Sequence, residues 1–506
     1  MDKLLQIANG QAVNRADIPD LDFSDFQNSV LETTLHNGFV VQFFAYENEQ
    51  SALKLVTVLR QEDKLLVTGC SLADEYPSLS QECEKFHMFE REIAEQFGVR
   101  PLDHPWLKML RYHENYRGKP DVFGNDYTVD IPGNYPYFTV DGDAIHEVAV
   151  GPVHAGIIEP GHFRFQCAGE KVLNLEIQLG YQHRGAEKLL EQKGMALNRL
   201  PVIAESIAGD TAIGHSLCHS QAIEALAGLE VDEGARIIRT VALELERIAC
   251  HVGDLAALSG DIAFNPPMNF FGRIRGEFLN LSLTMAGNRF GKGLVRPGGV
   301  AFAVGAEERQ IIVEKIIDET PGIVNVCDLL FSAHTVLARF ENTGTVSRAV
   351  AGKLGLVGYS GRASGLPYDA RVNFPTEAFA DMEATSNKRT TGDVCSRATV
   401  RREEIMHSLH FIPKLLARNR AAKPLAVPAS HSLAANSFVV TVNEAWRGEV
   451  SHCLLTDQDG AILRYKVKDP SFHNWTGLAV SLRNQGISDF PLCNKSFNLS
   501  YCGFDL

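Results

Sequence analysis

The pattern that most constrains the fold is an apolar stripe between residues 233 and 258. Its large apolar side chains recur at steps of three or four residues: Ile237, Val241, Leu245, Ile248, Val252 and Leu255. That spacing is typical of an α-helix with one buried face. We therefore expect a long helix here, and we expect helices to dominate from about residue 149 to residue 506.

The first 116 residues show a different pattern. Apolar, β-branched and aromatic runs of strand length cover residues 39–46, 53–59 and 64–69. A helical face with phenylalanine or isoleucine at every third or fourth position follows between residues 86 and 97, and Gly98 marks its end. The sequence therefore predicts a small N-terminal α+β domain over residues 1–116.

Two further segments complete the expected organisation. Residues 117–148 are rich in Gly, Pro, Asn, Asp and Tyr, which indicates a linker or an ordered arm. Residues 437–468 have the pattern of strands, with a hairpin turn at residues 457–460. The expected fold class is α+β, with the N-terminal domain and the arm followed by a large, mainly α-helical domain over residues 149–506 that carries small β elements.

Charge and composition exclude several classes of protein. The chain has 48 Lys and Arg against 62 Asp and Glu, a net charge of −14, and no basic stripe, so we expect no nucleic-acid partner. No stretch approaches the roughly 18 apolar residues of a membrane-spanning helix, and the first 17 residues lack the pattern of a secretory signal. The ten cysteines contain no CxxC pair and are expected to be reduced thiols of a cytoplasmic protein.

Several segments concentrate charged side chains between glycines and prolines. The first carries His154, Glu159, His162 and Arg164, the second carries His183, Arg184, Glu187 and Lys188, and a later one carries Arg362, Asp369 and Arg371. On the predicted long helix, Glu244, Arg247 and His251 share a face. Each segment also has an ordinary structural explanation, as a tight loop or as a solvated row of salt bridges. No one of them supports a functional conclusion alone.

The order of these segments along the chain resembles that of a known family. Six segments occur in a fixed order along the chain: GPVHAGIIEPGH, YQHRGAEKL, LELERIACH, GNRF with RPGG, GRASG, and DFP with SF. This order is similar to that of the large subunit of group 4 [NiFe] hydrogenases of the formate hydrogenlyase type, and of the homologous quinone-side large subunit of respiratory complex I. FEREIAEQFGV and HPWLKMLRY resemble the small complex I subunit that is often fused to it. The resemblance covers residues 35–115 and 149–506 and implies a hydrogenase-large-subunit-like second domain.

The metal site of that family needs four cysteine thiolates in two CxxC pairs, because soft sulfur ligands hold nickel and iron. With His215 as anchor, the resemblance places the first pair at Ala208 and Thr211, and it places the second at Ser500 and Gly503. Alanine and glycine offer no ligand atom, and a hydroxyl is a poor substitute for a thiolate. We therefore expect no nickel–iron centre, assign no metal ligand, and do not expect a functional [NiFe] hydrogenase.

The chain also departs from the complex I subunit. The histidine that meets the quinone head group there corresponds to Ile158, and the segment 208–212, near which a quinone-facing tyrosine should fall, contains none. The sequence EPGH at residues 159–162 follows the hydrogenlyase branch, in which the glutamate resembles a proton relay. The chain therefore resembles the metal-less, hydrogenase-related large subunits.

The resemblance leaves an emptied cavity as the candidate site. The residues expected to line it or to relay protons in it are Glu159, His154, His162, Asp210 and His215. A buried carboxylate near a histidine has a perturbed pKa and can pass protons. The face formed by Glu244, Arg247 and His251 would extend this relay toward membrane partners.

Two functions fit these observations. In the first, the chain is a peripheral subunit on the cytoplasmic side of a membrane, in a complex I-like oxidoreductase that couples electron transfer to ion translocation. A partner iron–sulfur small subunit with a [4Fe–4S] cluster would deliver electrons, antiporter-like subunits would form the membrane arm, and a quinone is a candidate acceptor. In the second, the chain is a non-catalytic scaffold of such a complex. A hydrogenase with unusual ligands is a third, less favoured alternative. No cofactor is expected to bind the chain directly, and no GxGxxG fingerprint for NAD is present.

Overall fold

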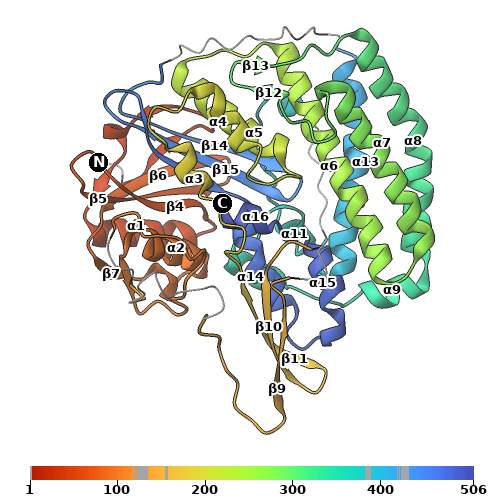
Figure 1. The fold of residues 1–506 in the computed structure, drawn as a ribbon, viewed down its shortest axis with the longest axis horizontal. Coiled ribbons are helices and arrows are strands. Elements are labelled where there is room, and N and C mark those ends of the chain that lie inside the picture. Colours follow the sequence, from red (N-terminus) through yellow and green to blue (C-terminus); the bar gives the residue numbers. More distant parts are fainter. Residues whose placement is uncertain are drawn as a thin grey trace.

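The computed structural model describes residues 3–118, 122–123, 135–153, 158–381, 389–418, 420, 422 and 432–506. An N-terminal α+β unit lies on one side of the molecule, a layer of long helices lies on the other, and a second sheet lies between them (Figure 1). The helical and strand content and their order confirm the expected α+β fold class.

The N-terminal unit is built on a five-stranded sheet in which β1, β6, β5 and β4 are neighbours and β3 pairs with β6. Its strands are β1 (Leu5–Ile7), β3 (Asp20–Leu21), β4 (Phe39–Glu47), β5 (Leu53–Gln61) and β6 (Lys64–Ser71). Helices α1 (Phe23–Leu35) and α2 (His87–Phe97) pack on it. Gly98 ends α2 in the left-handed conformation, φ 64°. The three predicted strands and the predicted helix of this unit are confirmed.

Four long helices form the helical layer: α6 (Glu233–Asp261), α7 (Asn265–Ala286), α8 (Ala306–Ser332) and α13 (Val394–Leu416). The Asp232 carboxylate caps α6 by accepting from the Ala235 amide. The whole predicted apolar stripe of α6 is buried against its neighbours. Within the described residues no single helix is both long and apolar enough to span a bilayer, whereas α8 and α9 (His334–Phe340), bent by 72° at their junction, meet that test only as a pair.

The sheet between these two parts has the order β16–β15–β14–β2. It consists of β14 (Ser437–Ala445), β15 (Gly448–Thr456), β16 (Ile462–Lys468) and the short β2 (Val13–Asn14) from the N-terminal unit. The predicted turn at residues 457–460 joins β15 to β16. Val41 and Phe44 of β4 share an apolar cluster with Val440 of β14 and Leu455 of β15. The N-terminal unit and the large domain are therefore joined by a common core and by one strand pairing.

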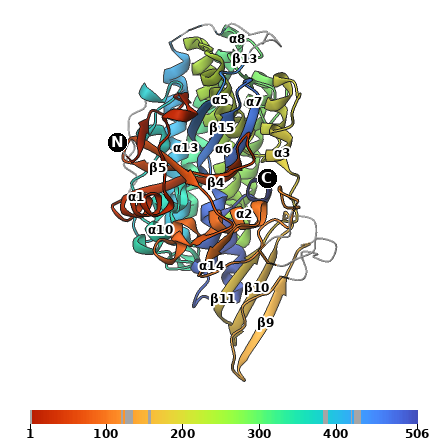
Figure 2. The ribbon, with the colours of Figure 1, turned by 90° about the vertical axis from the view of Figure 1, so that its left-hand side faces the viewer.

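A three-stranded sheet, ordered β11–β10–β9, projects from the body of the molecule (Figures 1 and 2). Its strands are β9 (Ile145–Val150), β10 (His162–Ala168) and β11 (Lys171–Gln178). The predicted arm over residues 117–148 lies partly outside the described residues, and its last residues open β9.

Short elements connect these parts. They are β7 (Glu75–Pro77), β8 (Arg100–Leu102), α3 (Ala186–Leu190), α4 (Leu200–Ala204), α5 (Ala212–Ala227), β12 (Val295–Arg296), β13 (Gly299–Val300), α10 (Arg348–Leu354), α11 (Gly358–Ala363), α12 (Ala370–Asn373), α14 (Ser471–Ser481), α15 (Phe490–Phe497) and α16 (Tyr501–Asp505). All ten cysteines are free thiols, as expected.

Candidate functional site

The two segments in which the resemblance places the metal ligands are bridged by Arg447. This residue lies in the turn between β14 and β15. Its guanidinium donates to both carboxylate oxygens of Asp210 at 2.6 and 2.8 Å and to the Thr211 hydroxyl at 3.1 Å. Its Nε donates to the Asn498 carbonyl at 2.7 Å, two residues before Ser500. A guanidinium thus spans the two segments that a metal would otherwise join.

The residues at the four ligand positions do not fit a nickel–iron centre. Ala208 and Thr211 are fully buried, and the Ser500 hydroxyl accepts from the Gly503 amide at 2.9 Å to cap α16. A side chain at Gly503 would force its neighbours to shift, because a Cβ there would lie 2.7 Å from Cγ and Oδ2 of Asp469 and 2.8 Å from Oγ of Ser500. The carboxylate of Asp469 therefore occupies the space that a cysteine at position 503 would need.

Two of the predicted site residues, Glu159 and Asp210, line one cavity of about 400 Å³. The cavity is also lined by Ile158, Cys250, Asp254, Arg275, Trp446, Arg447, Lys495 and Tyr501. Glu159 accepts from the Tyr501 amide at 3.2 Å. The Asp210 side chain is 39% exposed. Burial raises its pKa, but the paired Arg447 guanidinium outweighs burial and holds the pKa below its ordinary value.

A second carboxyl group, Glu246 of α6, lies beside this cavity. It lines an adjoining hollow with Asp210 and Cys250. Glu246 accepts from the amides of Ile213 and Gly214 at 2.8 and 3.2 Å, at the N-terminus of α5. Burial dominates over these two bonds and raises the pKa of Glu246 to about 8. At neutral pH this group can therefore hold a proton.

The other predicted cavity residues lie elsewhere. His154 falls outside the described residues. His162 begins β10, its ring lies 5.2 Å from that of Tyr137, and it is not among the residues that line the cavity. His215 is fully buried and contacts Asp469 and His452, at 3.1 Å each, instead of facing the cavity. The expectation that Glu159, Asp210 and His215 share one cavity surface is therefore met only for the first two.

The face formed by Glu244, Arg247 and His251 is buried, whereas an ordinary row of salt bridges would be solvated. All three side chains are fully buried. Arg247 lies 3.0 Å from Glu244 and 3.4 Å from Glu404 of α13, and His251 contacts the same Glu404 at 2.9 Å. This face points into the protein rather than toward a surface where membrane partners would dock.

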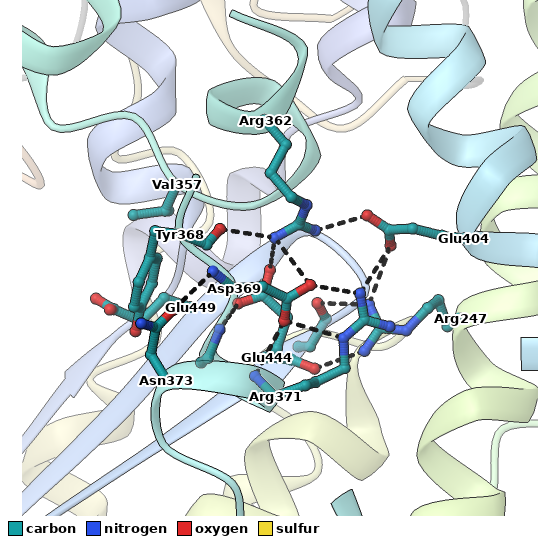
Figure 3. Close-up of polar contacts among 12 residues, drawn as sticks. Arg247, Val357, Arg362, Tyr368, Asp369, Arg371, Asn373, Glu404, Glu444 and Glu449 are labelled. Carbon is teal, nitrogen blue, oxygen red and sulfur yellow. Dashed lines mark hydrogen bonds and ion pairs between the residues drawn. The ribbon is translucent and has the colours of Figure 1, made fainter. Parts of the chain in front are cut away.

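The same cluster takes in the segment of Arg362, Asp369 and Arg371 (Figure 3). Arg362 lies 2.6 Å from Glu404 and 2.6 Å from Glu444. Arg371 lies 2.6 Å from Asp369 and 3.7 Å from Glu244. We call the set Arg247, Arg362, Arg371, Glu244, Glu404, Glu444, Asp369 and His251 the buried ionic cluster. Sequence reasoning found six of its members, in two separate segments, and missed Glu404 and Glu444, whose local sequence carries no distinguishing signal.

The acids of the buried ionic cluster differ in their affinity for a proton. Burial raises the pKa of Glu404, but Arg362, His251 and Arg371 reverse this effect and hold it well below its ordinary value. Burial also raises the pKa of Glu444, and there Arg362 only partly offsets it, so that the pKa stays above its ordinary value. Four acids face three arginines, and Glu444 is the acid that is most easily protonated.

Two regions of the chain match known protein families. Residues 25–128 match the family of the 30-kDa subunit of respiratory-chain NADH dehydrogenase, and residues 261–437 match that of its 49-kDa subunit. The chain is therefore a fusion of these two families in one polypeptide, related to the large subunits of group 4 hydrogenases.

Individual relatives agree with this assignment. The chain is 25% identical to hydrogenase-4 component G of Escherichia coli K12, over 92% of this chain and 83% of that protein. It is 26% identical to formate hydrogenlyase subunit 5 of the same organism, over 92% of this chain and 82% of that protein. Its fold is similar to a chain of the membrane-bound sulfane sulfur reductase, an archaeal respiratory membrane complex, with TM-score 0.66 and 22% identity over 73% of this chain and all of that one.

Proposed function

We propose that this chain is a peripheral subunit of a complex I-like oxidoreductase that couples electron transfer to ion translocation without a nickel–iron centre. One observation carries the proposal: at the four positions that the resemblance assigns to metal ligands, Arg447 bonds Thr211 and its neighbour Asp210, and the Asp469 carboxylate lies against Gly503. The relatives are components of hydrogenase and respiratory membrane complexes, which supports a place in a multi-subunit assembly.

The cavity beside this pair is the proposed reaction site. Glu159 and Asp210 line it, and Arg275 and Lys495 add positive charge. An iron–sulfur small subunit with a [4Fe–4S] cluster is the proposed electron donor, and a quinone is the proposed acceptor. Glu159 is the proposed group that exchanges protons with the reacting molecule. We place the chain on the cytoplasmic face of a membrane arm that contains antiporter-like subunits.

Metal analysis combined with electron paramagnetic resonance tests this proposal. The intact complex would be isolated through this subunit. We expect no stoichiometric nickel, reducible iron–sulfur signals, and antiporter-like membrane subunits in the preparation. Stoichiometric nickel would overturn the assignment of Ala208, Thr211, Ser500 and Gly503 to the ligand positions. An assembly without reducible clusters would leave only a scaffold.

A scaffold without catalytic activity is the second candidate, and one observation favours it. Both oxygens of Asp210 accept hydrogen bonds from Arg447, so this carboxylate of the cavity wall is already engaged in an ion pair. Replacing Glu159 by Gln separates the two functions, because this change should abolish ion-coupled activity of the complex in the first case and leave it unchanged in the second. Glu147→Gln is the matched control, since Glu147 is an acid of the preceding strand β9 that pairs with Arg164 and is not among the residues that line the cavity.

A further inference from the structure

A continuous chain of hydrogen bonds runs through the core between α5 and the strands β15 and β16. It joins Asp469, His215, His452, Tyr465 and His219 in that order. The distances are 3.1 Å from Asp469 Oδ2 to His215 Nε2 and 3.1 Å from His215 Nδ1 to His452 Nε2. They are 2.8 Å from His452 Nδ1 to Tyr465 Oη and 2.8 Å from there to His219 Nδ1. All five side chains are at most 1% exposed.

Each hydrogen bond in this series of residues has its donor on the side of His219 and its acceptor on the side of Asp469. Asp469 is ionised, because its bond to His215 and the nearby Arg447 hold its pKa below the ordinary value although burial raises it. With four protons shared among the other residues, only one arrangement makes every contact a hydrogen bond. His215 donates from Nε2 to Asp469, His452 donates from Nε2 to His215, Tyr465 donates to His452, and His219 donates from Nδ1 to Tyr465. His219 Nε2 then carries no proton.

The hydrogen-bonded series ends at His219. The Nε2 atom of His219 is buried and has no hydrogen-bond partner among the described residues. Arg296 of β12 is the nearby charge that, after burial, lowers the pKa of His219 to about 3. The Arg296 side chain is 20% exposed and pairs with Glu205 at 2.7 Å. The open end therefore lies near a charged pair that reaches the surface, whereas the Asp469 end lies beside Arg447.

We propose that these five residues form a proton wire that carries a proton from His219 to Asp469. A proton binds His219 Nε2, and the Nδ1 proton passes to Tyr465 while the Tyr465 proton passes to His452 Nδ1. The Nε2 proton of His452 passes to His215 Nδ1, and the Nε2 proton of His215 passes to Asp469 Oδ2. One proton enters and one is bound by Asp469, and each imidazole ends neutral with its proton on the other nitrogen.

This shift suits the buried environment. Burial disfavours an imidazolium at His219 and His452, whose pKa values lie far below the ordinary range. The shift leaves no charge on either ring, and it neutralises Asp469, the one carboxylate among these five residues. Because Asp469 lies beside Arg447, its protonation would weaken the hold on the guanidinium that pairs with Asp210. The use of that proton in catalysis rests on the proposed function, whereas the wire itself can be tested without any redox step.

Hydrogen exchange of the imidazole N–H groups tests the wire in the full chain. Nuclear magnetic resonance on protein with ¹⁵N-labelled histidine follows His215, His452 and His219 separately. In Tyr465→Phe the hydroxyl step is lost, so exchange at His215 and His452 should slow by about tenfold, as expected when a barrier rises by about 1.4 kcal/mol. His219, on the open side of the break, should exchange as before.

The direction of the change separates a wire from a purely structural network. If the hydroxyl only stabilises the core, its loss loosens the packing and exchange at His215 and His452 becomes faster or stays the same, which overturns the proposal. Tyr359→Phe is the matched control, because it removes another fully buried hydroxyl, bonded to the Phe497 carbonyl outside the chain. If Tyr465→Phe does not fold, the wild-type rates decide: a common rate at the three histidines supports the wire, and three unrelated rates exclude it.

Discussion

Two regions of this protein contain buried charged side chains, and they differ in how those charges are paired. In the buried ionic cluster each arginine faces several acids within a closed core, as Arg362 does with Glu404 and Glu444. Beside the cavity lined by Glu159 and Asp210, a single guanidinium, Arg447, spans two segments. In the first region each arginine pairs with several acids, so the positions and charges of these side chains are hard to change. The second leaves a carboxylate partly exposed, so chemistry is more readily placed there.

The largest effect is expected where the buried ionic cluster is broken. Arg362→Ala leaves Glu404, Glu444 and Asp369 without their shared cation, which should cost about 3–5 kcal/mol of unfolding free energy. Chemical denaturation of the purified chain measures this cost. Arg402→Ala is the control, because its pair with Asp328 is 34% and 60% exposed and should contribute about 0–1 kcal/mol. Equal losses in the two variants would show that the cluster contributes no more than a surface pair.

A smaller effect is expected where Gly503 packs against Asp469. Gly503→Ala forces a Cβ against Asp469, and overpacking of this kind costs about 1–3 kcal/mol. Gly209→Ala, where an added Cβ meets no atom within 4 Å, should be close to neutral. The double variant Gly503→Ala with Asp469→Ala should lose less stability than the sum of the two single losses, because the contact of the added Cβ with Asp469 is absent and only that with Ser500 Oγ, at 2.8 Å, remains. Additive losses would mean that Asp469 does not restrict the space beside Gly503.

The pH dependence of stability should reflect Glu246. Its folded-state pKa is raised to about 8, above the unfolded value of about 4.3. Its contribution to stability is therefore complete below about pH 4.3 and is lost as the pH rises to about 8. Glu246→Gln should raise the melting temperature at pH 9 relative to wild type, and the gain should shrink toward pH 5. An equal shift at both pH values would contradict a raised pKa.

The smallest effect is expected at the cavity wall. Asp210→Asn removes the charge that the Arg447 guanidinium faces; Arg447 is 4% exposed, but Asp210 is 39% exposed and the asparagine oxygen still accepts, so the change should cost only about 1 kcal/mol. Thermal unfolding of the variant beside wild type at neutral pH gives the difference. A loss as large as that of Arg362→Ala would remove the contrast between the two regions.

Local patterns predicted the local elements of this fold. The apolar stripe of α6, the strand runs of the N-terminal sheet and Gly98 at the end of α2 follow from spacing and residue type alone. Contacts between distant segments were not predictable in this way. Glu404 and Asp469 gain their roles from residues more than 150 positions away, and neither stands in a distinctive motif. Of the hydrogen-bonded residues in the core, sequence reasoning identified only His215, and it missed His219, one turn further along α5.

The pairing of β2 with β14 has a consequence for the synthesis of the chain. Val13 and Asn14 find their partners, Phe438 and Ser437, about 420 residues later. At about 5–20 residues per second, the ribosome needs about 20 to 85 s to supply them. During that time the apolar face of the N-terminal sheet that will meet β14 and β15, including Val41 and Phe44, has no cover. The core between the N-terminal sheet and β14 and β15 can therefore be completed only after residues 437–456 have been synthesised.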